Sequence, residues 1–81
     1  MKYRVAIPAD GRIKIRGEIP ITDLTGVLNE IMEGGATFVK YIGIDRPLFK
    51  NRNILCDIEC DEKTLLLFRL KGWEVYGESG D

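Results

Sequence analysis

The chain has 81 residues, a formal net charge of −1, and a composition that is 44% hydrophobic and 31% charged. This balance is typical of one globular domain and excludes an intrinsically disordered chain. No apolar run approaches the roughly 18 residues that a membrane-spanning helix needs, and the first residues lack the apolar core of a signal peptide. We therefore expect a cytoplasmic protein with no membrane partner, folded as a single domain over residues 1–81.

The residue types also argue against catalysis. The sequence contains no histidine, so the commonest general base is missing, and no serine or cysteine lies in a recognisable nucleophile motif. Cys56 and Cys60 are four residues apart, which matches neither a CxxC motif nor a disulfide within one strand. We expect both to be small core residues, and we expect neither enzyme activity nor a metal site nor a cofactor.

Residues 2–18 predict a β-hairpin closed by a three-residue turn at residues 9–11. In that register Ile7 pairs with Ile13 and Val5 with Ile15, so that one face is apolar. The opposite face then carries five basic side chains, namely Lys2, Arg4, Arg12, Lys14 and Arg16. A solvated sheet face and an anionic partner both fit this pattern. Nucleic acid fits it less well, because the chain is not basic overall and no aromatic residue lies among these charges.

Residues 21–35 predict a helix whose two ends are marked in the sequence. Its buried stripe recurs at helical spacing and consists of Leu24, Val27, Leu28 and Ile31. Thr22 or Asp23 is expected to cap the first turn, and Gly34 or Gly35 to end the last turn in the left-handed conformation.

Gly26 is unexpected within this helix, because glycine in a helix costs about 1 kcal/mol of stability relative to alanine. One interpretation is that the missing side chain allows a neighbouring strand to pack closely. The other is that the first turn receives a carboxylate or phosphate on its free N–H groups. The candidate ligand-binding residues are Asp23, Leu24, Thr25, Gly26 and Val27.

Two further strands are predicted at residues 36–45 and 53–60, pairing as a hairpin with a long exposed tip. The second strand alternates, with Ile54, Cys56, Ile58 and Cys60 inward and Leu55, Asp57 and Glu59 outward. Basic side chains of the tip, at Arg46, Lys50 and Arg52, are placed to meet solvent or an anionic ligand.

Residues 61–72 predict a second helix, although a strand over residues 64–70 is the alternative reading of the same apolar run. As a helix it buries a stripe of Leu66, Leu67 and Leu70. Leu65 and Phe68 then widen the apolar surface beyond what one sheet face covers, which indicates a protein interface, most simply with a second copy. Residues 73–76 form the last strand, and residues 77–81 a flexible tail.

From residue 12 onward the expected order is strand–helix–strand–strand–helix–strand, and two motifs within it resemble the ACT domain. Residues 23–28 are similar to the D-x-x-G-x-L pattern at the first strand–helix junction of that family. Residues 57–65 followed by 72–75 resemble its closing strand–helix–glycine–strand. ACT domains are small regulatory modules that typically bind amino acids.

The resemblance implies an α+β, ferredoxin-like sandwich with both helices on one face of an antiparallel sheet, to which residues 1–11 add an extra strand and turn. It also implies a ligand at the turn of residues 23–27, at the interface of a homodimer. We thus expect a stand-alone regulatory module that binds a small carboxylate-bearing ligand, such as an amino acid, and acts in trans. The alternative is a non-catalytic interaction subunit of a larger complex.

Overall fold

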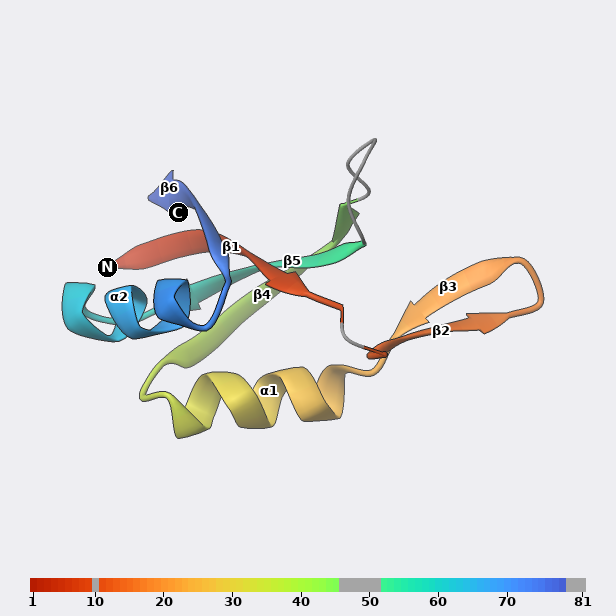
Figure 1. The fold of residues 1–81 in the computed structure, drawn as a ribbon, viewed down its shortest axis with the longest axis horizontal. Helices are drawn as coiled ribbons and strands as arrows, with labels where there is room; N and C mark the ends of the chain where they lie inside the picture. Colours follow the sequence, from red (N-terminus) through yellow and green to blue (C-terminus); the bar gives the residue numbers. More distant parts are fainter. Residues whose placement is uncertain (10, 46–51, 79–81) are drawn as a thin grey trace.

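The computed structural model describes residues 1–9, 11–45 and 52–78 and shows a small α+β fold. Its elements, in chain order, are β1 (Lys2–Pro8), β2 (Ile13–Arg16), β3 (Ile19–Thr22), α1 (Leu24–Glu33), β4 (Thr37–Asp45), β5 (Asn53–Glu59), α2 (Glu62–Leu70) and β6 (Glu74–Glu78) (Figure 1). No helix of the described ranges is long and apolar enough to cross a membrane.

The first strand occupies the interior of the main sheet, whose order is β4-β5-β1-β6 with antiparallel neighbours throughout. The predicted hairpin of residues 2–18 is therefore wrong. β1 pairs along its whole length with β5, and β2 pairs with β3 instead. Pairing with the distant strands β5 and β6 is more favourable than pairing with β2, because it gives β1 two neighbouring strands. It also buries Tyr3, Val5 and Ile7 completely or nearly so.

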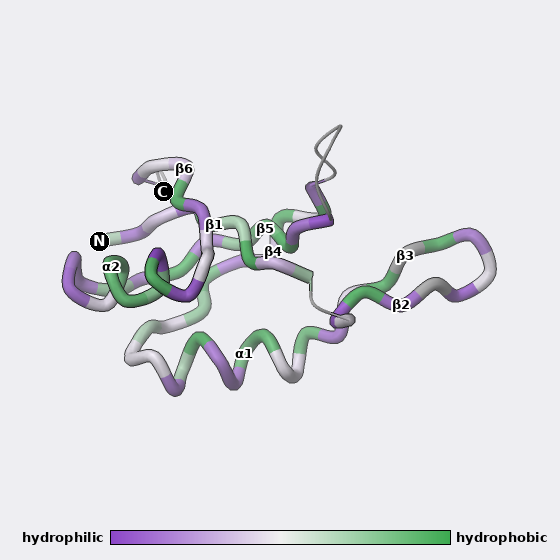
Figure 2. Tube along the Cα trace, viewed as in Figure 1, coloured by the Kyte–Doolittle hydropathy of each residue, from purple (hydrophilic) through white to green (hydrophobic). Residues whose placement is uncertain are grey.

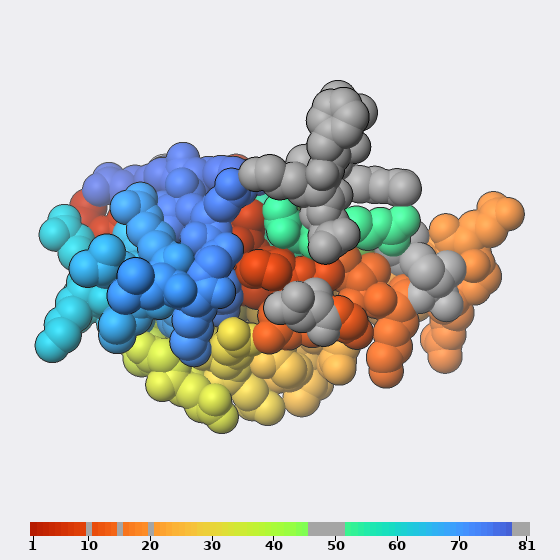
Figure 3. All heavy atoms as spheres, viewed as in Figure 1, coloured from red at the N-terminus to blue at the C-terminus, as the bar shows by residue number. Residues whose placement is uncertain are grey.

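The β2–β3 hairpin is the part of the fold that the sequence did not predict. Its strands meet at Gly17, which has a positive φ of 66°, in the two-residue turn that antiparallel strands favour. Residues 1–11 are consequently not an addition to the sheet. The β2–β3 hairpin extends from one end of the molecule (Figure 3).

The predicted pairing of residues 36–45 with 53–60 is confirmed by the β4–β5 ladder. Ile54, Cys56 and Ile58 are fully buried, as their alternation indicated. The tip between the strands, including Arg46 and Lys50, lies outside the described residues. β6 runs two residues further than predicted, to Glu78, and pairs with β1.

Both helices pack into one core with the same face of the sheet. α1 contributes Val27 and Ile31, and α2 contributes Leu65 and Phe68. Along α1, the apolar residues face the sheet and the polar residues face outward (Figure 2). The rest of the buried core consists of Tyr3, Val5, Ile7, Ala36, Ile54, Cys56, Ile58, Cys60 and Trp73.

Both helix ends follow the glycine signals. Gly35 follows α1 with a φ of 95°, and Gly72 follows α2 with a φ of 100°, both in the left-handed region that glycine adopts cheaply. The helical reading of residues 62–70 is confirmed, and the alternative strand over residues 64–70 is wrong.

The sheet face opposite the helices is held by polar contacts. Arg4 bonds the carboxylate of Asp57 through two nitrogens, at 3.0 and 3.4 Å. Asp57 faces away from the helices, as predicted, but it is buried (4% exposed) under this pair. The Tyr76 hydroxyl donates to Asp45 at 2.7 Å, which joins the two edge strands β6 and β4.

Candidate functional site

The predicted ligand-binding residues form the first turn of α1, where Asp23 occupies the N-cap position. Its side chain makes no capping hydrogen bond, so the prediction that Thr22 or Asp23 caps this turn is wrong. Thr22 shares a hydrogen bond with the Tyr41 hydroxyl at 3.0 Å instead. Of the five residues, Asp23, Thr25 and Gly26 are exposed, Leu24 is half-buried, and Val27 belongs to the core.

Gly26 has open space where a side chain would be. A Cβ atom built on it meets no atom within 4 Å outside the helix's own backbone. The interpretation that glycine is needed for close strand packing is therefore wrong. An anion at this turn stays a prediction, with the turn's surface open to receive it.

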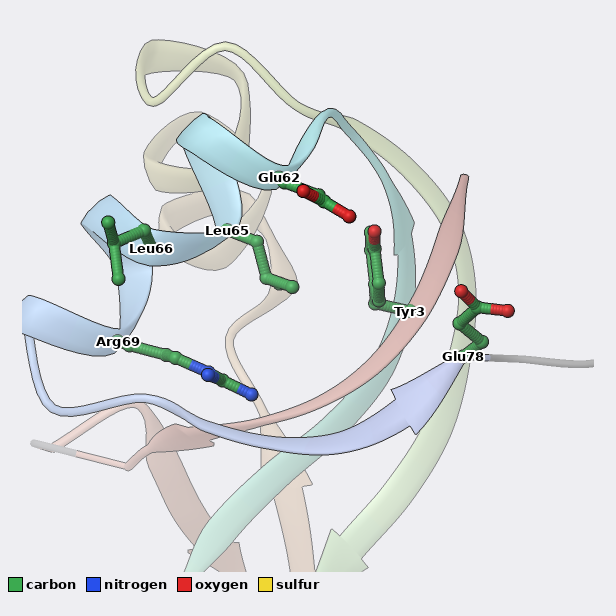
Figure 4. A pocket seen from close by; sticks show the side chains of 6 residues that line it. All are labelled: Tyr3, Glu62, Leu65, Leu66, Arg69 and Glu78. Atoms are coloured by element: carbon green, nitrogen blue, oxygen red, sulfur yellow. The ribbon is translucent and has the colours of Figure 1, made fainter.

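A cavity of about 390 Å³ lies at the other helix, between α2 and the β1–β6 edge of the sheet. Its lining comes from three elements of the chain, β1, α2 and β6, and Figure 4 shows the side chains around it. They are Tyr3, Glu62, Leu65, Leu66, Arg69 and Glu78.

The cavity combines two carboxylates, one guanidinium group and a buried phenol. Glu62 comes from the first turn of α2 and points toward the Tyr3 hydroxyl, and Glu78 lies directly opposite Tyr3 in the β1–β6 register (Figure 4). Burial raises the pKa of Tyr3, and the nearby carboxylates Glu62 and Glu78 raise it further. The phenol is therefore neutral at physiological pH, and its O–H donates to the Met1 sulfur at 3.6 Å, a weak acceptor that a ligand oxygen can replace.

Arg69 supplies the opposite charge from the last turn of α2, and its guanidinium group extends into the cavity (Figure 4). Leu65 forms an apolar wall between the two charged ends. The arrangement suits a small molecule that carries an anionic and a cationic group, because arginine binds carboxylates in a planar, bidentate fashion while carboxylates accept from an ammonium group.

The sequence contained part of the signal for this site. Glu62 and Arg69 are seven residues apart, two helical turns, and so lie on one side of α2. Tyr3 and Glu78, however, meet only through the β1–β6 pairing. Because residues 2–18 were predicted to form one hairpin, the last strand had no predicted partner.

The predicted interface residues of α2 are buried, which corrects the assignment of its two faces. Leu65 is 8% exposed and Phe68 is 1% exposed, and the Phe68 ring stacks on Trp73 with centroids 4.1 Å apart. The apolar residues that remain exposed are Leu66, Leu67 and Leu70, the stripe that was predicted to be buried. The aromatic stack decides the rotation of the helix, because burying two rings removes more apolar surface than burying leucine side chains.

The predicted basic face does not exist as one surface. Arg4 pairs with Asp57 on the main sheet, and Arg12 forms an ion pair with Glu30 of α1. Lys14 and Arg16 remain exposed, on the β2–β3 hairpin.

The cysteines fit the role expected of them, as both are free, buried thiols. Burial, assisted by the charge of Asp57, raises the pKa of Cys56 to about 12, so this thiol is not a nucleophile at neutral pH. The described part of the chain holds no cluster of three or more potential metal ligands.

Comparison with protein-family models, with curated proteins and with solved structures finds no match for this chain.

Proposed function

We propose that this protein is a small, non-catalytic regulatory module that binds an amino acid or a similar zwitterion in the cavity between α2 and the β1–β6 edge. The observation that carries the proposal is the placement of Arg69 at one side of this cavity and of Glu62 and Glu78 at the other. In this proposal the module acts in trans on a partner protein in the cytoplasm.

The chemistry of the cavity assigns a role to each group. Arg69 receives the ligand carboxylate, and Glu62 and Glu78 receive its ammonium group, with the Tyr3 hydroxyl between them. Leu65 contacts the ligand side chain. A volume of about 390 Å³ falls within the range of roughly 300–1,000 Å³ that is usual for small-molecule sites.

A ferredoxin-like, ACT-like architecture is part of this proposal. Without the β2–β3 hairpin, the element order is β1–α1–β4–β5–α2–β6. The sheet order sets β5 between β1 and β4, and β1 between β5 and β6, so each strand–helix–strand unit is split by a strand of the other. This supports β1 as the first strand of such a fold, with the hairpin inserted before α1.

We also propose that the protein is a homodimer whose contact includes the exposed leucines of α2. Leu66 is 57% exposed and lines the cavity, so a second copy that covers this helix would also close the ligand site. The same leucines support the alternative function, an interaction subunit of a larger complex. A ligand-free protein whose leucines bind only a different chain would favour that alternative.

A thermal-shift panel of the twenty amino acids tests the function, because a ligand that binds only the native state raises the melting temperature. For any amino acid that does so, calorimetric titration of Arg69→Ala and Glu62→Gln should show affinity reduced by about tenfold or more, since each removes a charge-assisted hydrogen bond. Lys63→Ala is the matched control, on the same helix but outside the cavity. No shift with any amino acid, or equal affinity in all three variants, would contradict the proposal.

A further inference from the structure

The β2–β3 hairpin, residues 13–22, forms an arm whose base is bonded to the rest of the protein. Arg12, just before β2, donates to the Pro8 carbonyl at 3.0 Å and forms an ion pair with Glu30 of α1. At the end of β3, Thr22 bonds the Tyr41 hydroxyl on β4. Beyond these contacts the two strands pair with each other and, within the described residues, with no third strand (Figure 1).

The alternation of hydrogen-bonded and non-hydrogen-bonded residue pairs in the arm shows which backbone groups point outward. The Asp23 N–H donates to the Arg12 carbonyl at 2.7 Å. Arg12 and Asp23 are therefore a hydrogen-bonded pair, and they are adjacent to the Ile13–Thr22 pair in the ladder. Bonded and non-bonded pairs alternate in an antiparallel ladder. The pairs Lys14–Ile21 and Arg16–Ile19 are therefore bonded inward, whereas the backbone groups of the pairs Ile13–Thr22 and Ile15–Pro20 point away from the hairpin.

The two outer edges of the arm are consequently unequal. On β3, one outward position is Pro20, which has no N–H to donate, and proline is a common means of blocking an edge strand. On β2, the outward positions Ile13 and Ile15 both offer an N–H and a carbonyl. β2 is thus the edge that another strand can join.

The side chains beside this edge are basic. Lys14 and Arg16 share one face of β2, are exposed, and have no hydrogen-bond or ion-pair partner within the described residues. Their cross-strand neighbours are Ile21, which is 42% exposed, and Ile19, which is 67% exposed. A strand added to β2 would bring its own side chains directly opposite the two cations.

We propose that β2 binds an extended, acidic segment of a partner protein as a third strand, with carboxylates opposite Lys14 and Arg16 and an apolar residue between them. Main-chain bonds to Ile13 and Ile15 supply the pairing, and the charges set its register. The partner segment is ordered as a strand when it pairs with β2. The arm becomes three-stranded, and three strands are needed for a sheet of this kind to be stable by itself.

A second copy of β2 fits this edge poorly. Antiparallel self-pairing about Ile15 would set Lys14 opposite Arg16 of the other copy, and like charges directly opposite are unfavourable. Nucleic acid is also a poorer fit, because exposed isoleucines alternate with the cations across the arm and no aromatic side chain of the arm is available to stack on bases.

The test is an NMR titration of the whole protein with a short, blocked peptide of alternating glutamate and valine. Amide resonances of residues 13–16 should shift, and the N–H groups of Ile13 and Ile15 should become protected from exchange. The double variant Lys14→Glu with Arg16→Glu should bind about tenfold more weakly or not at all, since attraction becomes repulsion at two positions. A peptide of alternating lysine and valine should leave the spectrum of the natural chain unchanged.

A second variant separates strand pairing from simple charge attraction. Ile15→Pro keeps both cations but gives β2 the block that Pro20 gives β3, so it should lose the peptide while resonances of the main sheet stay in place. The proposal is overturned if the glutamate peptide shifts no resonance of β2 or if Ile15→Pro binds as well as the natural chain. It is also overturned if protection of Ile15 grows with protein concentration alone, which would indicate a second copy, or if vesicles of anionic lipid or a DNA duplex, rather than the peptide, protect this edge.

Discussion

The two helices of this protein begin with the same residue type and differ in how the first turn is satisfied. At α2, the Asp61 side chain accepts from the Thr64 N–H at 2.8 Å. At α1, Asp23 occupies the same position and makes no such bond. A capping residue in the sequence is therefore not sufficient; the backbone before it has to leave the side chain free to turn toward the helix.

The backbone explains the difference. The Asp23 N–H is bonded to the Arg12 carbonyl, so Asp23 also makes the last backbone hydrogen bond at the base of the arm. Its ψ is 92°. Asp61 follows the end of β5 with a ψ of 171°, in the extended conformation typical of an N-cap. The first turn of α2 is thus closed by its own side chain, while that of α1 stays open. The following predictions test this contrast.

The largest expected effect is the loss of the aromatic stack that fixes α2. Phe68→Ala should destabilise the protein by about 3–5 kcal/mol, because it empties a fully buried site beside Trp73. Chemical denaturation measures it. At protein concentrations at which the protein is a monomer, Leu66→Ala, on the exposed side of the same helix, should change the free energy of unfolding by less than about 0.5 kcal/mol. Comparable losses in both variants would show that α2 is rotated differently.

The second effect concerns the place where the two helices meet. A Cβ atom at Gly34, just after α1, would overlap the ring of Phe68. Gly34→Ala should therefore destabilise by about 1–3 kcal/mol through overpacking, although its φ of −76° suits alanine. Urea denaturation of this variant beside the natural chain provides the measurement. Unchanged stability would mean that α2 moves independently of α1.

The third prediction compares the two caps directly. Asp61→Ala should cost about 1 kcal/mol, whereas Asp23→Ala should stay within about 0.5 kcal/mol of the natural chain. Denaturation curves at pH 7 measure both. Equal losses would show that Asp23 caps α1 in solution.

The pH dependence of stability provides a check on the same cap. The bond from Thr64 lowers the pKa of Asp61 below its usual value. The contribution of Asp61 is then fully present above the carboxyl's unfolded pKa of about 3.9 and is lost as the pH falls through the lower, folded value. The difference in stability between the natural chain and Asp61→Ala should therefore shrink in acid. A difference that grows in acid would contradict the assigned cap.

Much of this fold could be predicted because local signals decide it. The helix of residues 24–33 followed from its apolar stripe and its glycines, and the β4–β5 hairpin followed from the alternation around Cys56. β1 could not be assigned in this way, because its partners lie at residues 53–59 and 74–78 and the choice between near and distant partners depends on total burial.

For the same reason, the cavity at α2 was not predicted as a ligand site; the residues predicted to bind a ligand were residues 23–27, in the first turn of α1. Leu65 was predicted, with Phe68, to form a protein interface, but the stacking of Phe68 on Trp73 turns this side of α2 inward and makes Leu65 part of the cavity wall. Tyr3 and Glu78 reach that cavity through strand pairing between the two ends of the chain. No pattern local to either end contains that information.

The smallest expected effect, at Gly26, decides between the two helices as the ligand site. Gly26→Ala should stabilise the protein by about 0.5–1 kcal/mol, because alanine favours the helix and its Cβ meets open space. If the ligand binds in the cavity at α2, its affinity by calorimetric titration should be unchanged in Gly26→Ala and reduced in Arg69→Ala. If the open turn of α1 receives the ligand carboxylate, the pattern reverses, because a methyl group at residue 26 then stands between the ligand and the free N–H groups while Arg69→Ala binds normally. The first pattern supports the proposed function as argued, and the second assigns it to residues 23–27.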